Sequence, residues 1–167
     1  MKKVLIIIVS IFLCSFVSSG QKVGYLNTQT ILTQVPEYNS AVQTLEKLSD
    51  QYKQYIEKEK AKIDQAYAKY QSERAFLGES ARQVKENEII TMERNLQAKQ
   101  KEYFGENGVM AKKSEQLLNP IKAKVDNAIR KVAQKGGYSL IIDLSVVQGV
   151  AYYNEAEDLS LEVIRNL

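Results

Sequence analysis

Apolar residues in the middle of the chain follow a helical period over an unusually long stretch. From Glu37 to Leu77 there is neither proline nor glycine. Apolar residues first recur at alternating steps of three and four, at Tyr38, Ala41, Leu45, Leu48, Tyr52 and Tyr55. The stripe then shifts by one position and continues with Ile56, Ile63, Tyr67, Tyr70 and Leu77. The pattern predicts one helix of about 41 residues, roughly 60 Å long, with an interrupted apolar stripe.

A second helix is expected to return antiparallel to the first. Gly78 is predicted to end the first helix in a left-handed conformation, and Ser80 with Gln83 forms a capping-box pattern for the second. The returning stripe is Ile89, Met92, Leu96 and Tyr103, at spacings of three, four and seven. The sequence therefore predicts a helical hairpin that turns near residues 77–80.

Two glycine segments interrupt and end the returning helix. The sequence Phe-Gly-Glu-Asn-Gly at 104–108 is expected to break or loosen it, after which apolar residues resume from Leu117 to Val132. Gly136 and Gly137 should end it. Counting equal lengths from the turn places Pro36, the expected first helical residue, level with Pro120. A proline inside a helix should kink it or end it.

The two ends of the chain predict a small sheet. Residues 22–27, 138–143 and 149–153 have the composition of short strands, and residues 28–34 that of a short helical turn. Asp158 is placed to cap a last helix over residues 159–166. The expected fold class is α+β and mostly α, with residues 21–36 and 121–167 forming a body and residues 37–120 forming a helical-hairpin arm.

Three short strands cannot bury a core of useful size in one chain. A monomer would leave poorly covered apolar residues and open strand edges, which proteins normally pair or cover. We therefore expect the sheet to form on association of several chains, through cyclic sharing of strands. The alternative is a monomer whose C-terminal helix covers the sheet. The expected oligomer contacts are Val23, Tyr25, Leu140, Ile142, Val150 and Tyr152.

The first twenty residues have the pattern of a secretory signal peptide. Lys2 and Lys3 precede an apolar run that ends at Val17, and Ser18-Ser19-Gly20 offers small residues for cleavage. The run is shorter than the ~20 residues of a spanning helix, although an uncleaved anchor is the alternative. Leu13 before Cys14 argues against a lipoprotein signal. After cleavage near Gln21 the exported protein would contain no cysteine.

Composition excludes several classes of chemistry. The chain has 23 basic and 20 acidic residues, and its net charge of +3 falls to +1 without Lys2 and Lys3. So small a net charge does not indicate a nucleic-acid-binding surface. There is no histidine, no phosphate-binding glycine loop and, after cleavage, no thiol. Most carboxylates alternate with lysine on helix surfaces. We expect no enzymatic activity, no cofactor, no metal site and no stable membrane insertion after signal removal.

The order of these elements resembles that of the Skp/OmpH family of periplasmic chaperones. The similarity is carried by VGYLNTQTILTQVPEY at 23–38, PIKAKVDNAIRKVAQKGGYSLIID at 120–143 and AYYNEAEDLSLEVI at 151–164. The resemblance implies a jellyfish-shaped homotrimer whose arms enclose a cavity for unfolded outer-membrane proteins, working without ATP. Well-known members have strongly basic arms. Here the arm charge is nearly balanced, so no lipopolysaccharide site is carried over.

The expected function is therefore to hold clients through many weak contacts. Interrupted stripes leave tyrosines partly available, and tyrosine suits wet, adaptable contact. The predicted client contacts are Tyr52, Tyr55, Tyr67, Tyr70, Phe76, Leu77, Ile89, Ile90 and Met92, each of which is also a candidate for simple helix packing. Gly105 and Gly108 are a predicted hinge or a tolerated helix defect. A structural coiled-coil envelope protein without chaperone activity is the alternative function, and an envelope hydrolase is disfavoured by the missing histidine and cysteine.

Overall fold

The computed structural model of the chain describes residues 21–167. The predicted signal peptide, including Cys14, lies outside these described residues. The described chain separates into two compact units, which are called here the body unit (residues 21–32 and 125–167) and the arm unit (residues 33–124). A long helical hairpin and a small sheet confirm the predicted α+β class. The domain boundaries expected at residues 36 and 120 remain a prediction.

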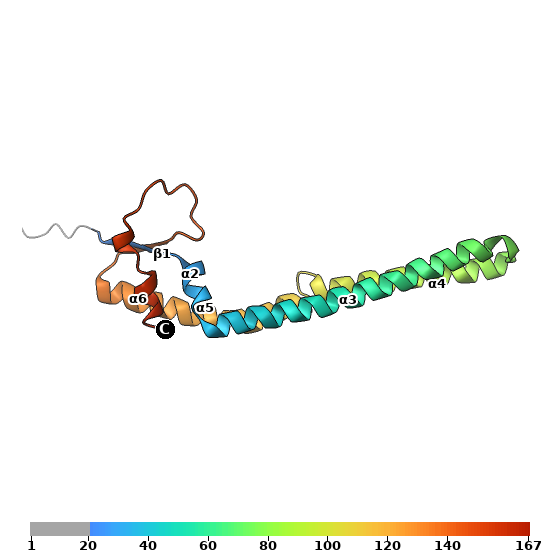
Figure 1. Cartoon of the computed structure of the whole chain (residues 1–167), viewed down its shortest axis with the longest axis horizontal. Coiled ribbons are helices and arrows are strands. Elements are labelled where there is room, and N and C mark those ends of the chain that lie inside the picture. The colour runs from blue at the N-terminus through green and yellow to red at the C-terminus, as the bar shows by residue number, and fades with distance from the viewer. Residues whose placement is uncertain (1–20) are drawn as a thin grey trace, which may run out of the picture. The chain divides into compact units, whose positions relative to one another are not determined.

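The arm unit is built on two long helices that run side by side (Figure 1). Helix α3 spans Pro36–Glu73 and helix α4 spans Glu79–Phe104, with a short 3-10 turn, η2, at Arg74–Phe76. Pro36 occupies the first turn of α3, as predicted, where its missing N–H costs no hydrogen bond. The hairpin predicted from the apolar period is therefore present, and its turn lies where the sequence places it.

The capping predicted at this turn is wrong in detail. Gly78 has φ −67° and ψ 161°, an extended conformation, and it precedes α4 without a side-chain cap from Ser80 or Gln83. The C-terminal end of α3 instead tightens into η2. There the carbonyl of Arg74 accepts a hydrogen bond from Nε of Arg82, at 3.0 Å. Because that carbonyl already has a partner, the turn does not need a left-handed glycine.

Helix α5 spans Val109–Gly136 and does not end at Pro120. A proline removes one hydrogen bond, and the remaining turns of a helix this long maintain it. Pro36 and Pro120 line one shallow groove of about 550 Å³, which confirms that they lie at the same level of the hairpin. The helix ends at Gly136, as predicted, and Gly137 follows with φ +66°, a left-handed conformation.

The sheet of the body unit has two parallel strands. Strand β1, Val23–Leu26, pairs with β2, Leu140–Asp143, in the register Val23 to Leu140. On the other side of β1, Tyr25 forms an isolated bridge to Asp158, and the Tyr25 carbonyl accepts the Leu159 N–H at 2.9 Å. Both edges of β1 are thus occupied, whereas the outer edge of β2 has no strand partner among the described residues.

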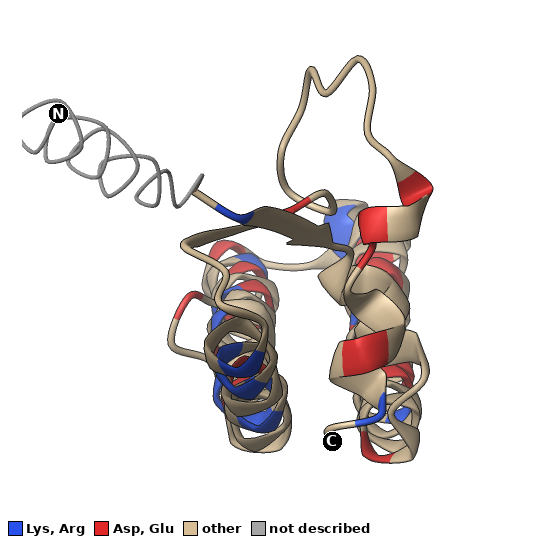
Figure 2. Cartoon of the chain, turned by 90° about the vertical axis from the view of Figure 1, so that its left-hand side faces the viewer, with Lys and Arg blue, Asp and Glu red and all other residues tan. Residues whose placement is uncertain are grey.

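The third predicted strand is absent from the described chain. Residues 149–153 lie within a loop that joins β2 to the short helix η3, Glu155–Glu157. A strand needs a neighbouring edge with free backbone groups; both edges of β1 are occupied, and the segment does not pair with the outer edge of β2. The loop also contains no charged residue, as the uncoloured stretch in Figure 2 shows. It is called the apolar loop below and comprises residues 144–154.

Short helices complete the body unit. Helix α2 spans Thr28–Thr33 and helix α6 spans Ser160–Ile164. The Asp158 carboxylate accepts the Ser160 N–H at 2.7 Å, but α6 begins one residue later than predicted and Leu159 occupies its N-cap position. The most completely buried side chains come from four elements and are Leu26, Ile31, Val132 and Val163. The Tyr138 ring lies against Gly24 and Gly136, where an added Cβ would overlap it.

Asp143 joins the end of β2 to the start of α2. Its carboxylate accepts hydrogen bonds from the Thr28 N–H at 3.1 Å, the Thr28 hydroxyl at 2.5 Å and the Ser145 N–H at 2.9 Å. Burial raises the pKa of the Asp143 carboxyl, but the donors from Thr28 and Ser145 outweigh it and hold the pKa below its usual value. The ionised carboxylate therefore stabilises the folded body unit.

Replacing Asp143 with asparagine is expected to lower the free energy of unfolding by about 1 kcal/mol at pH 7, because hydrogen bonds to a charged acceptor contribute more than those to a neutral one. A lowered folded-state pKa gives stabilisation that is complete above the unfolded pKa and is lost as pH falls through the folded pKa. The difference between the two proteins should therefore shrink below about pH 4. Urea unfolding from pH 7 down to pH 3 measures it, and a constant difference would contradict this account.

Candidate functional site

The arm unit exposes large apolar side chains at its tip and along its length. Phe76, in the turn η2, is 89% exposed, and Tyr55, Tyr67, Val84 and Ile90 are also exposed. Val84 was not among the predicted contact residues, because it falls outside the apolar stripe of the returning helix. Charged residues stand between these side chains along the sequence. The arm unit therefore offers several apolar contacts.

The predicted client-contact residues fall into three groups. Tyr55, Tyr67, Phe76 and Ile90 are exposed. Tyr52, Leu77 and Met92 are half-buried between the helices. Tyr70 and Ile89 are buried, with 5% and 8% exposure, and together with Ile63 they form the core cluster of the arm. Contact between a client and any of these residues stays a prediction, and the exposed group is the one available to a partner.

Polar contacts hold the outer part of the hairpin around this core cluster. The Tyr70 hydroxyl donates a hydrogen bond to the Glu86 carboxylate, linking α3 to α4. That bond, followed by burial, raises the pKa of the Tyr70 hydroxyl. Lys85 forms a second link between the helices, an ion pair with Glu73 at 3.4 Å. The tip of the arm is therefore fastened by both apolar and polar contacts.

A group of four aromatic residues connects α3 to the last turn of α4. The rings of Tyr52 and Tyr103 are stacked, with centroids 4.0 Å apart and an interplanar angle of 9°. Phe104 and Tyr55 meet this pair edge-on, Phe104 at Tyr52 and Tyr55 at Tyr103. The sequence indicated the apolar role of Tyr52 and Tyr103, but it did not reveal the stack. These four residues are called the aromatic group below.

The aromatic group lies directly before the predicted helix break. Helix α4 ends at Phe104 and α5 begins at Val109, which confirms an interruption at residues 105–108. A Cβ at Gly105 would overlap the Lys101 carbonyl oxygen, and one at Gly108 would lie 2.8 Å from the Glu102 carbonyl oxygen. Glycine is therefore required at both positions for steric reasons. An alanine substitution would distort the turn, so it would not test bending alone.

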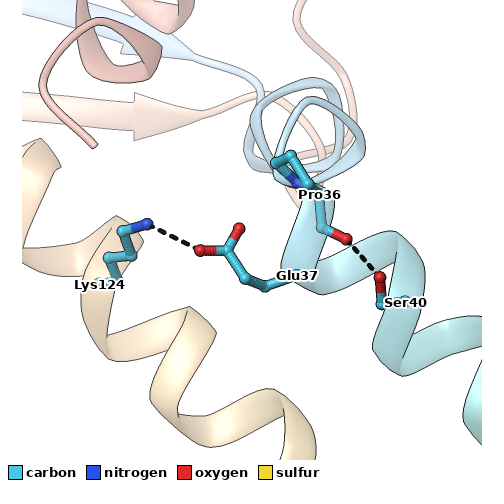
Figure 3. A network of polar contacts seen from close by, with 4 residues as sticks. All are labelled: Pro36, Glu37, Ser40 and Lys124. Atoms are coloured by element: carbon cyan, nitrogen blue, oxygen red, sulfur yellow. Dashed lines mark hydrogen bonds and ion pairs between the residues drawn. The ribbon is translucent and has the colours of Figure 1, made fainter.

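At the end of the arm unit away from the turn, an ion pair connects α3 to α5. Lys124 Nζ of α5 lies 3.2 Å from Glu37 Oε1 of α3, and the Ser40 hydroxyl donates to the Pro36 carbonyl at 3.0 Å (Figure 3). The backbone N–H at Glu37, and then Lys124, hold the pKa of the Glu37 carboxyl below its usual range. Both partners are largely exposed, so the pair adds little stability.

The charges of the arm are mixed along both helices. Acidic and basic residues alternate in the sequence of these helices, as in Glu57-Lys58-Glu59-Lys60 of α3. Among the described residues, no helix is long and apolar enough to cross a membrane. In the same part of the chain, no cluster of acidic or sulfur ligands is arranged to hold a metal ion.

The body unit exposes a second set of apolar side chains. Tyr152 is 84% exposed, and Val146, Val147, Val150 and Tyr153 of the apolar loop are exposed with it. Of the other predicted oligomer contacts, Val23 and Leu140 are exposed, Ile142 is half-buried and Tyr25 is buried. The loop is fixed at one end, because the Tyr25 hydroxyl donates to the Asn154 carbonyl and the Tyr25 ring meets Tyr153 edge-on.

Comparison with known proteins identifies the family. Residues 22–167 match the family described as outer membrane protein (OmpH-like), so the chain belongs to the OmpH-like family. The chain is 22% identical to the chaperone protein Skp of Yersinia enterocolitica over 146 residues, 87% of this chain and 85% of that protein. It is 21% identical to the chaperone protein Skp of Pectobacterium atrosepticum over 151 residues, 90% and 88% of the two chains.

A solved structure supports the fold. A crystal structure of an OmpH-like outer membrane chaperone from Caulobacter crescentus aligns with 87% of this chain and 82% of its own, with a TM-score of 0.66 and 14% identity. The family resemblance expected from the two ends of the sequence is confirmed. Members of this family are chaperones and not enzymes, which agrees with the chemistry that the composition excludes.

Proposed function

We propose that this chain is a periplasmic chaperone that binds unfolded outer-membrane proteins without ATP and keeps them from aggregating. The observation that carries the proposal is the arm, which exposes several large apolar side chains in a sequence of nearly balanced charge. Separate apolar contacts of this kind bind an unfolded chain weakly at many points. They also leave the chaperone soluble when it holds no client. The chaperone names of its relatives support the same assignment.

The proposed assembly is a homotrimer formed through the body unit. Two features support it: the outer edge of β2 lacks a strand partner in the described chain, and the neighbouring apolar loop exposes Tyr152 and several valines. A neighbouring copy would pair the strand edge and cover the loop. Sedimentation of the purified mature chain should give a trimer at micromolar concentration, and a clean monomer would contradict this.

An aggregation assay tests the proposed function. A urea-unfolded β-barrel protein is diluted into buffer that contains no nucleotide, with and without a stoichiometric amount of the mature chain. The chain is expected to abolish most of the light scattering. A variant carrying Tyr55→Ser, Tyr67→Ser and Phe76→Ser should protect the client much less, because it has lost exposed apolar area on the arm.

The matched control changes three exposed glutamines of α3, as Gln51→Ser, Gln65→Ser and Gln71→Ser. It removes similar side-chain bulk without removing apolar surface, so it should protect the client as well as the natural chain does. Full aggregation in the presence of the natural chain would favour a structural coiled-coil protein. Equal protection by both triple variants would show that the exposed arm residues do not contact the client.

We also propose that the break at residues 105–108 lets the arm bend, and that the aromatic group restrains this motion. Replacing Tyr52 with alanine removes the stack on Tyr103 and the edge contact with Phe104, while both glycines stay. Amide hydrogen exchange over residues 101–108 is expected to become about tenfold faster. Tyr67→Ala, at an exposed tyrosine of the same helix, is the control; unchanged exchange in Tyr52→Ala would argue against the restraint.

A further inference from the structure

A groove of about 390 Å³ lies between α3 and α4 in the arm unit. Its apolar lining comes from Ile63 of the core cluster, from Met92 and Leu96 of α4, and from Tyr55 of the aromatic group. Glu59 and Lys99 contribute its polar rim. The groove therefore occupies the interval between the two regions where the helices are well packed.

The groove exists because each helix has a charged residue at a position where the apolar stripe predicts an apolar one. Glu59 lies midway between Tyr55 and Ile63 on one face of α3, and Lys99 fills the gap between Leu96 and Tyr103 on α4. Each turns to a neighbour on its own helix. Lys62 Nζ lies 2.6 Å from Glu59, and Lys99 Nζ lies 2.7 Å from Glu102. Neither side chain fills the space between the helices.

The charges at the rim indicate an uncharged occupant. One acidic and one basic residue face the groove, and both are already paired, so an ionic ligand would gain no free partner there. The lining instead favours a ring. Tyr55 offers an edge-on aromatic contact, Met92 a polarisable thioether and Lys99 an ammonium that already lies 5.7 Å from the centroid of the Tyr103 ring.

We propose that this groove binds single aromatic side chains of unfolded polypeptides. The proposal rests on the function proposed above and names the part of the client that the arm recognises. Each such contact is weak and quickly reversible, so an unfolded chain with several aromatic residues would be held without being fixed in one conformation. Aliphatic side chains would enter the same space, but they lack the contacts with Tyr55 and Lys99 that depend on a ring.

Methionine labelling provides a direct test. Residues 21–167 contain only two methionines, Met92 in the groove and Met110 in α5, which does not line it. The mature chain labelled with 13C-methyl methionine is titrated with a blocked glycine-serine peptide that carries one central tyrosine, and then with the same peptide carrying leucine. The Met92 methyl signal should move with the tyrosine peptide while the Met110 signal stays. Affinity for tyrosine should exceed that for leucine about fivefold.

A variant whose groove is filled provides a second test. Ala98 lines the groove, and Ala98→Phe should place a ring in it and weaken binding of the tyrosine peptide about tenfold; Ala68→Phe, at an exposed position of α3, is the matched control. Equal affinity for the two peptides, or no movement of the Met92 signal, would overturn the proposal. If the chain still prevents client aggregation in that case, only the groove is excluded. If aggregation also proceeds, the proposed function fails with it.

Discussion

Replacing Ile31 with alanine is expected to lower the free energy of unfolding by about 3 kcal/mol. Ile31 is 0% exposed in the short helix α2, so the change removes three buried carbon atoms and leaves a cavity in the body unit. Alanine is a better helix former than isoleucine, which offsets only a few tenths of a kcal/mol. Urea unfolding followed by circular dichroism, at one fixed protein concentration, measures the difference.

The matched control is Ile90→Ala, which makes the same chemical change on an exposed face of α4. It should alter the free energy of unfolding by less than about 1 kcal/mol. Similar losses from the two substitutions would mean that α2 contributes no more to the stability of the fold than an exposed helical position does.

Replacing Tyr152 with aspartate is expected to convert the proposed trimer into monomers. Tyr152 is 84% exposed in the single chain, so a charge there costs the isolated chain almost nothing. In a trimer the same side chain would be covered by a neighbour, and three unpaired carboxylates would have to be buried. The expected loss is several kcal/mol per assembly, which is more than a hundredfold in the association constant.

Sedimentation at micromolar concentration measures the change, with circular dichroism to show that the helices persist. Val84→Asp is the control, because it introduces the same charge at an exposed apolar position of the arm unit. That variant should remain a trimer. A trimer that survives Tyr152→Asp would show that the apolar loop lies outside the interface between subunits.

The features that the sequence predicted correctly depend on local patterns. The period of the apolar stripe in α3, the proline at its first turn and the glycines that interrupt the return helix each act over a few residues. Local backbone preference and helical periodicity determine such features directly. This is why the hairpin, its break and the end of α5 follow from the amino-acid sequence alone.

The features that it predicted wrongly depend on contacts between distant residues. The turn near Gly78 was predicted as a left-handed cap, but Arg82 binds the Arg74 carbonyl from the next helix and the chain turns in another way. Residues 149–153 have the composition of a strand, yet both edges of β1 are occupied and the segment does not pair with the open edge of β2. Composition alone does not reveal whether a segment has a partner.

The groove could be predicted only in part, because the sequence shows the interruptions of the apolar stripe but not how they are aligned. The apolar stripe visibly shifts near Tyr55, and the return helix skips one turn between Leu96 and Tyr103. Only the structure shows that these two interruptions face each other, because the alignment of the helices depends on the exact length of the turn between them. A difference of one residue at residues 74–78 would have placed Glu59 and Lys99 at other positions relative to each other.

The pairing of β1 with β2 has a consequence for the order of folding. Val23 lies near the start of the described chain, whereas its partner Leu140 lies near the other end, and Asp158 follows later still. Closing so large a loop is slow, while a hairpin of neighbouring helices forms quickly. The helices would therefore assemble first, while β1 remains unpaired. The chain thus begins folding as an incompletely folded polypeptide of the kind that chaperones bind.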